Sequence, residues 1–247
     1  MVNLRSLRPL SVAIFVSLLS CPMLFGVEPA GQQRREFEIL VDGNPMGTYR
    51  MKISDTQEQS VMELNADVKA NILFYTYMYQ FRGKEVWQDG KLSRVDSQTL
   101  DDGKPIRTSA TIKDDKTQIL INGERREGQG AHFTSSYWKL PEKYIRQRDK
   151  ATQVYILDPD DGVAKKATLT YVRAENLRLR NGDQTSMRFR LTGEVDVHLW
   201  YDTQGLLLRQ SFEEQGHLTD IRLTGVFKEG TRDAPRVGAV EDMFDMK

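Results

Sequence analysis

The chain has 247 residues, of which 39% are hydrophobic and 28% are charged, and its 35 basic residues balance its 35 acidic residues. This length is ample for one domain with a hydrophobic core of its own. Basic and acidic residues are interspersed and form no basic stripe, which excludes the usual electrostatic signature of a nucleic-acid-binding protein.

Residues 1–30 have the layout of a secretory signal peptide. Arg5 and Arg8 precede the uncharged apolar run Leu10–Leu19, and small or turn-forming residues follow it. That run is too short to span a bilayer comfortably, although an uncleaved membrane anchor is the alternative. We therefore expect an exported bacterial protein, located in the periplasm or anchored in the membrane as a lipoprotein.

Cys21 is the only cysteine of the chain. The tetrapeptide Leu18–Cys21 (LLSC) looks like a bacterial lipobox, in which Cys21 would be lipidated. Cleavage by the ordinary signal peptidase near Gly26 or Ala30 is the alternative, and the sequence leaves both open. In either case we expect no disulfide.

The next part of the chain reads as short extended runs separated by turn signals. Residues 36–41 and 47–53 flank Asp42–Pro45 and predict a first hairpin with a somewhat long turn. An Asp-Gly or Asn-Gly pair between two runs is a strong hairpin signal, because both turn residues need positive φ. Such pairs are Asp89-Gly90, Asp102-Gly103 and Asn122-Gly123.

The stretch 62–81 (MELNADVKANILFYTYMYQF) changes its pattern halfway. Its first half places apolar residues at even positions, which indicates a strand with one buried face, whereas a helix would scatter them around its circumference. Tyr75, Tyr77, Tyr79 and Phe81 then occupy odd positions. We interpret the switch as a bulge near Leu73 or as a strand covered on both faces. A strand of this length must curl or break.

Only residues 137–147 (YWKLPEKYIRQ) look helical, with Pro141 in the first turn. We expect an antiparallel β domain over residues 31–229 and a flexible tail over residues 230–247. Turn signals at roughly regular intervals favour an all-β fold. The predicted architecture is a single antiparallel meander curled into a half-open barrel, with one short helix.

The pattern of strands and turns resembles a large family of exported bacterial proteins known only as a domain of unknown function. The resemblance rests on Trp87–Gly90 (WQDG), Tyr137-Trp138, and Leu199–Asp202 (LWYD) with Gly205. It implies a cell-envelope protein whose sheet curls around a short helix, a shape similar to that of the lipoprotein carriers LolA and LolB. Those carriers cover the half-barrel with several helices, whereas this sequence predicts one. The resemblance implies no catalytic residues.

Aromatic residues are the best candidates for a ligand site. Tyrosine and tryptophan combine an apolar body with a polar tip, which suits a groove that is partly wet. The alternative is that they pack the core against the predicted helix. The residues expected to line one end of the concave sheet are Tyr75, Tyr77, Tyr79, Phe81, Trp138 and Trp200.

Other chemistry has weaker support. The three histidines, His132, His198 and His217, lack the spacing of a local metal-ligand pair, and we expect no metal ion. The acidic stretch Asp158–Gly162 is interpreted as a turn and not as a calcium loop. Glu194 and Asp196 lie two residues apart on a predicted strand, where they could flank a sugar or lie on a solvated outer face.

Three functional hypotheses follow. The first is a non-enzymatic cell-envelope protein that binds an apolar or amphipathic, lipid-like ligand in its concave sheet. The second is a structural or assembly factor that pairs a sheet edge with another envelope protein. The third is a glycan-acting hydrolase that uses Glu194 and Asp196. None of the three requires a cofactor.

Overall fold

A single sheet of 15 strands makes up most of the part of the chain that the structure describes. The computed structural model describes residues 31–72, 75–180, 182–214 and 216–228; the expected signal peptide, Cys21 and the tail lie outside them. The strand order is β8-β7-β6-β5-β4-β3-β2-β1-β15-β14-β13-β12-β11-β10-β9, and only β9 and β10 pair in parallel. The two edge strands, β8 and β9, do not pair with each other, so the barrel stays open.

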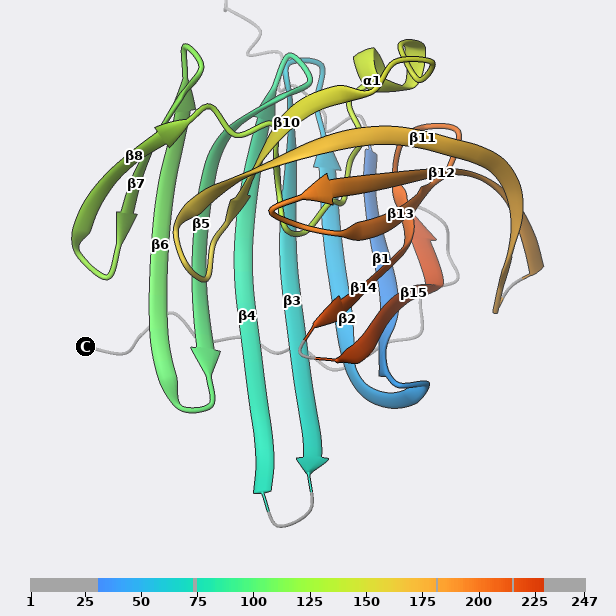
Figure 1. Cartoon of the computed structure of the whole chain (residues 1–247), viewed down its shortest axis with the longest axis horizontal. Coiled ribbons are helices and arrows are strands. Elements are labelled where there is room, and N and C mark those ends of the chain that lie inside the picture. Colours follow the sequence, from blue (N-terminus) through green and yellow to red (C-terminus); the bar gives the residue numbers. More distant parts are fainter. Residues whose placement is uncertain (1–30, 73–74, 181, 215, 229–247) are drawn as a thin grey trace, which may run out of the picture.

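The first eight strands form one wall of the molecule, as Figure 1 shows from blue to green. Each of these strands forms hydrogen bonds with the next one in the sequence. The strands are β1 (Gly31–Val41), β2 (Asn44–Asp55), β3 (Gln59–Ile72), β4 (Tyr75–Gln88), β5 (Lys91–Asp101), β6 (Lys104–Lys113), β7 (Lys116–Ile121) and β8 (Glu124–Gln129).

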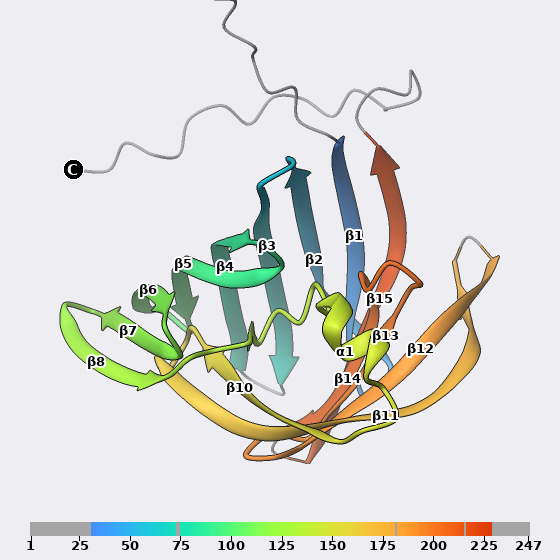
Figure 2. The same ribbon diagram turned by 90° about the horizontal axis from the view of Figure 1, so that it is seen from above.

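The remaining strands curl back across this wall, and the view from above shows the sheet folded over on itself (Figure 2). The strand β15 pairs with β1 and joins the two parts. These strands are β9 (Phe133–Thr134), β10 (Thr152–Asp158), β11 (Val163–Leu179), β12 (Gly182–Gly193), β13 (Val197–Tyr201), β14 (Leu207–Glu214) and β15 (His217–Lys228). The predicted all-β, half-open barrel is therefore confirmed.

Two-residue turns with positive φ connect most neighbouring strands of the first wall. Asp89 has φ 50° and Gly90 has φ 71°, and the pairs Asp102-Gly103 and Asn122-Gly123 have the same signs, as predicted. The first hairpin is tighter than expected, because Asp42 and Gly43 alone separate β1 from β2. Asp114-Asp115 forms a turn of the same kind without a glycine, and no turn was predicted there.

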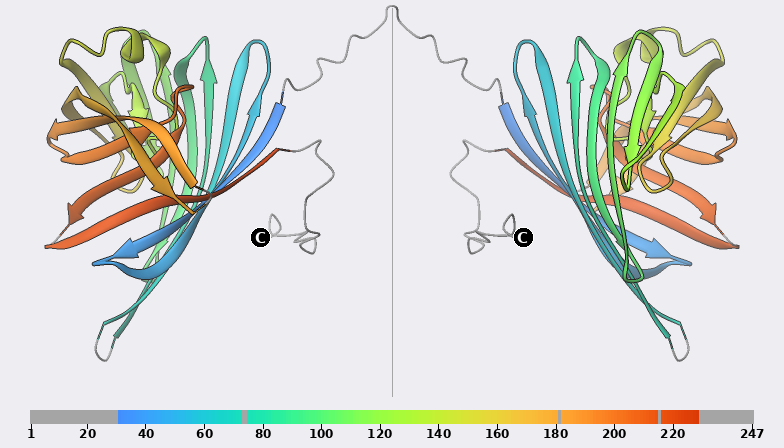
Figure 3. Two further views of the ribbon diagram at one scale, coloured as in Figure 1. Left: turned by 90° about the vertical axis from the view of Figure 1, so that its right-hand side faces the viewer. Right: turned by 90° about the vertical axis from the view of Figure 1, so that its left-hand side faces the viewer.

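The stretch 62–81 belongs to two antiparallel strands, β3 and β4, so the single strand predicted there, with a bulge near Leu73 or with both faces covered, was wrong; Leu73 itself lies outside the described residues. The two strands pair without a register shift, with Val68 opposite Tyr79 and Ala66 opposite Phe81. Every such pair joins an even-numbered residue to an odd-numbered one. The even positions of β3 and the odd positions of β4 therefore share one face of the sheet. The hairpin projects beyond the rest of the sheet (Figure 3).

The predicted helix is much shorter than expected. Only Glu142–Arg146 forms the helix α1, which lies over the end of the curled sheet opposite the β3–β4 hairpin (Figure 1). Pro141 is the residue that precedes it and is not part of its first turn. Tyr137 has φ 47°, which is not helical, and Lys139 forms a β-bridge with Leu206. The backbone before Pro141 therefore cannot be part of the helix.

Residues 131–140 form an irregular inner segment, most of whose side chains are buried. Its backbone is tied on two sides. The N–H groups of His132 and Ser135 donate to carbonyls of β10, and the N–H of Leu140 donates to the carbonyl of Gly205 at 2.7 Å. Gly205 has φ 77°, and a Cβ there would lie 2.5 Å from the carbonyl oxygen of Leu140, so glycine alone fits.

The carboxylate of Glu85 joins this inner segment to β4. Its Oε2 accepts the indole N–H groups of Trp87 and Trp138, both at 2.9 Å, and its Oε1 accepts the hydroxyls of Thr134 at 2.5 Å and Ser136 at 2.6 Å. Glu85 is 4% exposed, and four donors offset much of the cost of burying a carboxylate. Burial nevertheless raises the pKa of Glu85, against the hydrogen bonds that lower it.

We expect Glu85→Gln to fold and Glu85→Ala to lose at least about 3 kcal/mol of unfolding free energy, because the alanine leaves buried donors unpaired. The glutamine oxygen can still accept both indoles, and its amide can donate to the two hydroxyls, which can accept. Denaturant titrations would measure both effects. Glu63→Gln, on the exposed outer face of β3, is the control and should change the free energy by less than about 0.5 kcal/mol.

The raised pKa of Glu85 predicts that the unfolding free energy of the wild-type protein depends on pH. Because the pKa of Glu85 is higher in the folded state than its unfolded value of about 4.3, the folded state binds more protons between these two values. The unfolding free energy contributed by this group therefore falls as the pH rises through that window. Glu85→Gln should lack this fall. A wild-type profile that matches that of Glu85→Gln would contradict the assignment.

Candidate ligand-binding site

A cleft of about 760 Å³ opens inside the curled sheet. Its lining residues lie on β1 to β6, β14 and β15, and on the turns between β10 and β11 and between β12 and β13 with the strand ends beside those turns. The inner segment bounds it through residues 134–137. The lining residues run from the inner segment toward the β3–β4 hairpin, and the end of the cleft nearest that hairpin, where Tyr77, Asp101 and Glu214 lie, is called its mouth. This volume falls within the range of about 300–1,000 Å³ that is usual for small-molecule sites.

The floor of the cleft is apolar. The even positions of β3 provide most of it, because the alternation of the strand sends them all to the inner face. Leu64 and Ala66 are 4% and 5% exposed, so the floor belongs to the hydrophobic core as well. The apolar residues of the floor and walls are Ile39, Val41, Met62, Leu64, Ala66, Val68, Phe81, Val95, Ile106, Pro159, Val195, Val197, Phe212 and Ile221.

The mouth of the cleft carries carboxylates that tyrosine hydroxyls hold in place. The hydroxyl of Tyr77 donates to Asp101 at 2.8 Å, and that of Tyr79 donates to Asp160 at 2.7 Å. Thr99 also donates to Asp160, at 2.5 Å. Burial raises the pKa of Tyr79, and the nearby carboxylate of Asp160 adds to the effect. These tyrosines therefore stay neutral, with their polar tips at the mouth.

The turn between β10 and β11 supplies three of the acidic residues at the mouth. Lys165 donates to Asp158 at 2.6 Å and lies 3.0 Å from Asp161. Burial disfavours the charged lysine, but the hydrogen bonds to these two carboxylates outweigh it and raise the pKa of Lys165 to about 12. The third residue, Asp160, has no such cation beside it among the residues that the structure describes. Burial raises its pKa, against hydrogen bonds from Thr99 and Tyr79.

Three of the six aromatic residues predicted for the site line the cleft, namely Tyr77, Tyr79 and Phe81. Trp138 lies behind the wall, 1% exposed, with its indole edge-on to Trp87 at 5.7 Å. The backbone of Tyr75 lies in β4, but its side chain is outside the described part of the structure.

Trp200 lies away from the cleft. Its indole N–H donates to Glu175 at 2.5 Å, and its ring is flanked by the guanidinium groups of Arg188 at 4.9 Å and Arg209 at 4.5 Å. The strand alternation that buries Leu199 and Tyr201 on one face of β13 places Trp200 on the other. Its burial therefore comes from arginine side chains on that face.

Glu194 and Asp196 lie in the turn between β12 and β13, and the strand position predicted for them was wrong. Both line the cleft. Asp196 accepts two hydrogen bonds from Arg190, at 2.9 and 2.7 Å, which lower its pKa. Glu194 accepts from the backbone N–H of Lys166. A glycosidase acid needs a raised pKa, so Asp196 is poorly suited to that role.

The three histidines lie apart from one another. His132 accepts from the backbone N–H of Tyr155, His198 lies beside Arg188, and His217 lies beside Asp42. Within the described ranges, no group of three or more potential ligands is arranged to hold a metal ion. The same residues contain no helix that is long and apolar enough to cross a membrane.

Many lining residues escaped the sequence analysis, and two of them, Glu85 and Gln210, are buried polar residues. Glu85 lies at an odd position of β4, on the same face as Tyr77, Tyr79 and Phe81. That it is the one charged residue on this face was the only feature of the sequence that could have marked it as a buried, functional residue. Gln210 lies on β14 on the same face as Phe212 and Glu214. Its neighbours on the strand, Arg209 and Ser211, are polar too, so nothing in the local sequence marks this amide as part of a buried wall.

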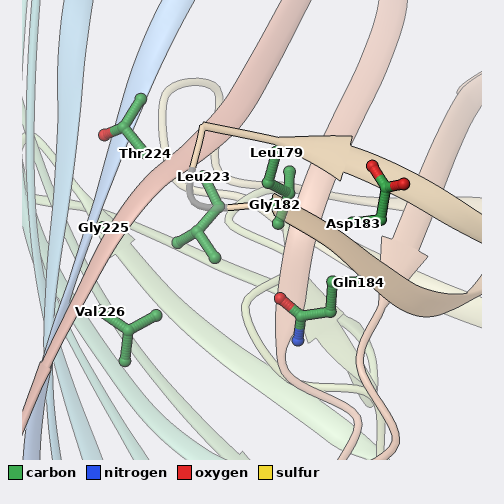
Figure 4. Close-up of a pocket in the computed structure, with 8 residues that line it drawn as sticks. All are labelled: Leu179, Gly182, Asp183, Gln184, Leu223, Thr224, Gly225 and Val226. Carbon is green, nitrogen blue, oxygen red and sulfur yellow. The ribbon is translucent and has the colours of Figure 1, made fainter.

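A smaller pocket of about 210 Å³ lies between the β11–β12 hairpin and β15 (Figure 4). Residues 223–226 of β15 face Leu179, Gly182, Asp183 and Gln184 across it. Its volume is below the usual range for a small-molecule site. The larger cleft is therefore the candidate site.

Comparison with known proteins gives a family and a fold but no activity. No curated protein matches the chain. Among solved structures, the chain is similar to the beta-barrel-like protein of the domain of unknown function DUF1849 from Brucella abortus. The TM-score is 0.62 and the identity 11%, over 81% of this chain and 99% of that one. This likeness confirms a barrel-like fold.

The family comparison is more direct. The family described as "Domain of unknown function (DUF6134)" matches residues 37–224. This range begins in β1 and ends in β15, and so takes in all the strands that build the cleft. The expectation of an uncharacterised family with a half-barrel fold is confirmed, and the chain belongs to the DUF6134 family.

Proposed function

We propose that the protein is a non-enzymatic binding protein of the bacterial cell envelope that accommodates an apolar or amphipathic, lipid-like ligand in its curled sheet. The cleft of about 760 Å³ carries this proposal. When a ligand covers an apolar floor, the complex is stabilised by about 25 cal/mol for each Å² of apolar surface removed from water. The polar mouth keeps the head of such a ligand in contact with water. A concave apolar site with a few polar groups is the usual form of a small-molecule site.

The rival hypothesis of strand addition at a sheet edge has less support. The edge strand β8 carries Glu124, Arg125, Arg126 and Glu127, and all four are exposed. Charged side chains on an edge strand oppose pairing with another chain. The other edge strand, β9, has only two residues. Neither edge offers the long unpaired strand that a partner would extend.

We expect Val68→Trp to weaken the binding of a neutral fluorescent probe, N-phenyl-1-naphthylamine, at least about tenfold, because the indole would occupy the cleft beside Tyr79. Lys69→Trp adds the same side chain to the exposed outer face of the same strand and is the matched control. Fluorescence titration would measure both. Equal affinities of the two variants, or no binding by wild type, would contradict the proposal.

The location in the envelope rests on the sequence of residues 1–30 alone. An alkaline phosphatase fused to the C-terminus of the full chain should be active in a bacterial host, because that enzyme requires export to form its disulfides. The same fusion without residues 1–30 should be inactive. An inactive full-length fusion would refute export. Labelling with a palmitate analogue, in wild type and in Cys21→Ala, would decide between lipidation at Cys21 and ordinary cleavage.

A further inference from the structure

The charges that line the cleft are strongly unbalanced. Nine acidic side chains line it, against the two basic side chains of Lys84 and Lys165. Lys165 is already engaged by Asp158 and Asp161, and Asp196 is paired with Arg190. The chain as a whole has no net charge, so this excess of carboxylates is a local property of the cleft.

Three carboxylates from different elements line the same cleft as the hydroxyl of Tyr77. Asp101 comes from the end of β5 and accepts the hydroxyl, Asp160 comes from the turn before β11, and Glu214 comes from the end of β14. Burial and the hydrogen bond to Asp101 raise the pKa of Tyr77, and Glu214 and Asp160 lie near enough to contribute. Within the described ranges, none of these three carboxylates has a Lys, Arg or His within 4.0 Å.

The wall of the cleft holds an independent sign of a missing ligand group. Gln210 is 4% exposed and lines the cleft, yet no donor among the described residues reaches its Oε1. A buried acceptor without a partner destabilises the structure that holds it. Gln210 Oε1 and the carboxylate of Glu214 lie on the same face of β14 and are both acceptors, so an occupant that carries N–H donors would complement them.

We propose that the ligand of this cleft is a cationic amphiphile, with an alkyl body on the apolar floor and a protonated amine at the mouth between Asp101, Asp160 and Glu214. This inference rests on the proposed function and narrows its ligand class. An ammonium group supplies both the positive charge that the carboxylates lack and N–H donors for them. Hydrogen bonds between ionised groups are the stronger kind, and the partly buried mouth screens them less than bulk water does.

The test is displacement of the neutral probe N-phenyl-1-naphthylamine from the full chain by three ligands with the same alkyl length, used below their micellar concentrations. These are dodecylammonium, dodecanol and dodecanoate. We expect dodecylammonium to displace the probe at a concentration at least about tenfold lower than dodecanol does, and dodecanoate to be the weakest. The preference for the cation should shrink as salt is added.

The variant Asp101→Asn/Glu214→Gln removes two of the three charges and should reduce the preference for the cation to below about threefold. The amide oxygen of the new asparagine would still be able to accept the Tyr77 hydroxyl. The control Glu63→Gln/Glu127→Gln removes two charges at exposed positions outside the cleft and should keep the preference. Glu214→Gln alone, at an exposed position, gives the same test with less risk to folding.

The outcomes separate the two proposals. If dodecanol and dodecylammonium displace the probe equally well, the cleft binds apolar chains but has no preference for a cation, and this inference fails alone. If the double variant keeps the full preference for dodecylammonium, other groups than these carboxylates bind the ammonium, and the inference also fails. If neither the probe nor any of the three ligands binds wild type, the proposed function fails with it.

Discussion

The buried carboxylate of Glu85 is the interaction on which the interior of this protein depends. Only one of its four donors, Trp87, lies on β4, and the others come from the inner segment. A carboxylate leaves water at a cost that only good hydrogen bonding offsets, so Glu85 holds that segment in one position. Because the segment fills one end of the curl and bounds the cleft through residues 134–137, the other end remains hollow. The cleft therefore exists because the inner segment occupies only one end of the curled sheet.

The residues that line the hollow follow from strand alternation. The inner face of β4 passes from Glu85 at the inner segment through Phe81 to Tyr77 at the mouth, and each step of two residues moves about 7 Å along the strand. Apolar side chains therefore lie deep and carboxylates lie at the rim. The tyrosines connect the two regions, since their rings join the apolar wall and their hydroxyls bind the carboxylates. An amphiphile matches this order better than a wholly apolar or wholly polar ligand does.

The sequence predicted the fold well because local chemistry decides most of it. Asp-Gly and Asn-Gly pairs fix the hairpins, and alternation fixes which faces are buried. The reversal between Ile72 and Tyr75 was missed because no such pair marks it, and the switch from even to odd positions was interpreted as a bulge or as a strand covered on both faces. Contacts distant in sequence were not predictable. Glu85 meets Trp138 across 53 positions and Tyr79 meets Asp160 across 81, and no short pattern reports either.

Photolabelling tests most directly whether this cleft holds an amphiphile. An alkylamine that carries a diazirine on its chain would be activated in the presence of the full chain, and the modified peptides would be identified by mass spectrometry. The structure predicts insertion into residues 62–68 of β3, 77–81 of β4 and 210–214 of β14, with loss of labelling in excess dodecylammonium. Labelling confined to the outer face, or to residues 179–184 and 223–226 at the smaller pocket, would contradict it.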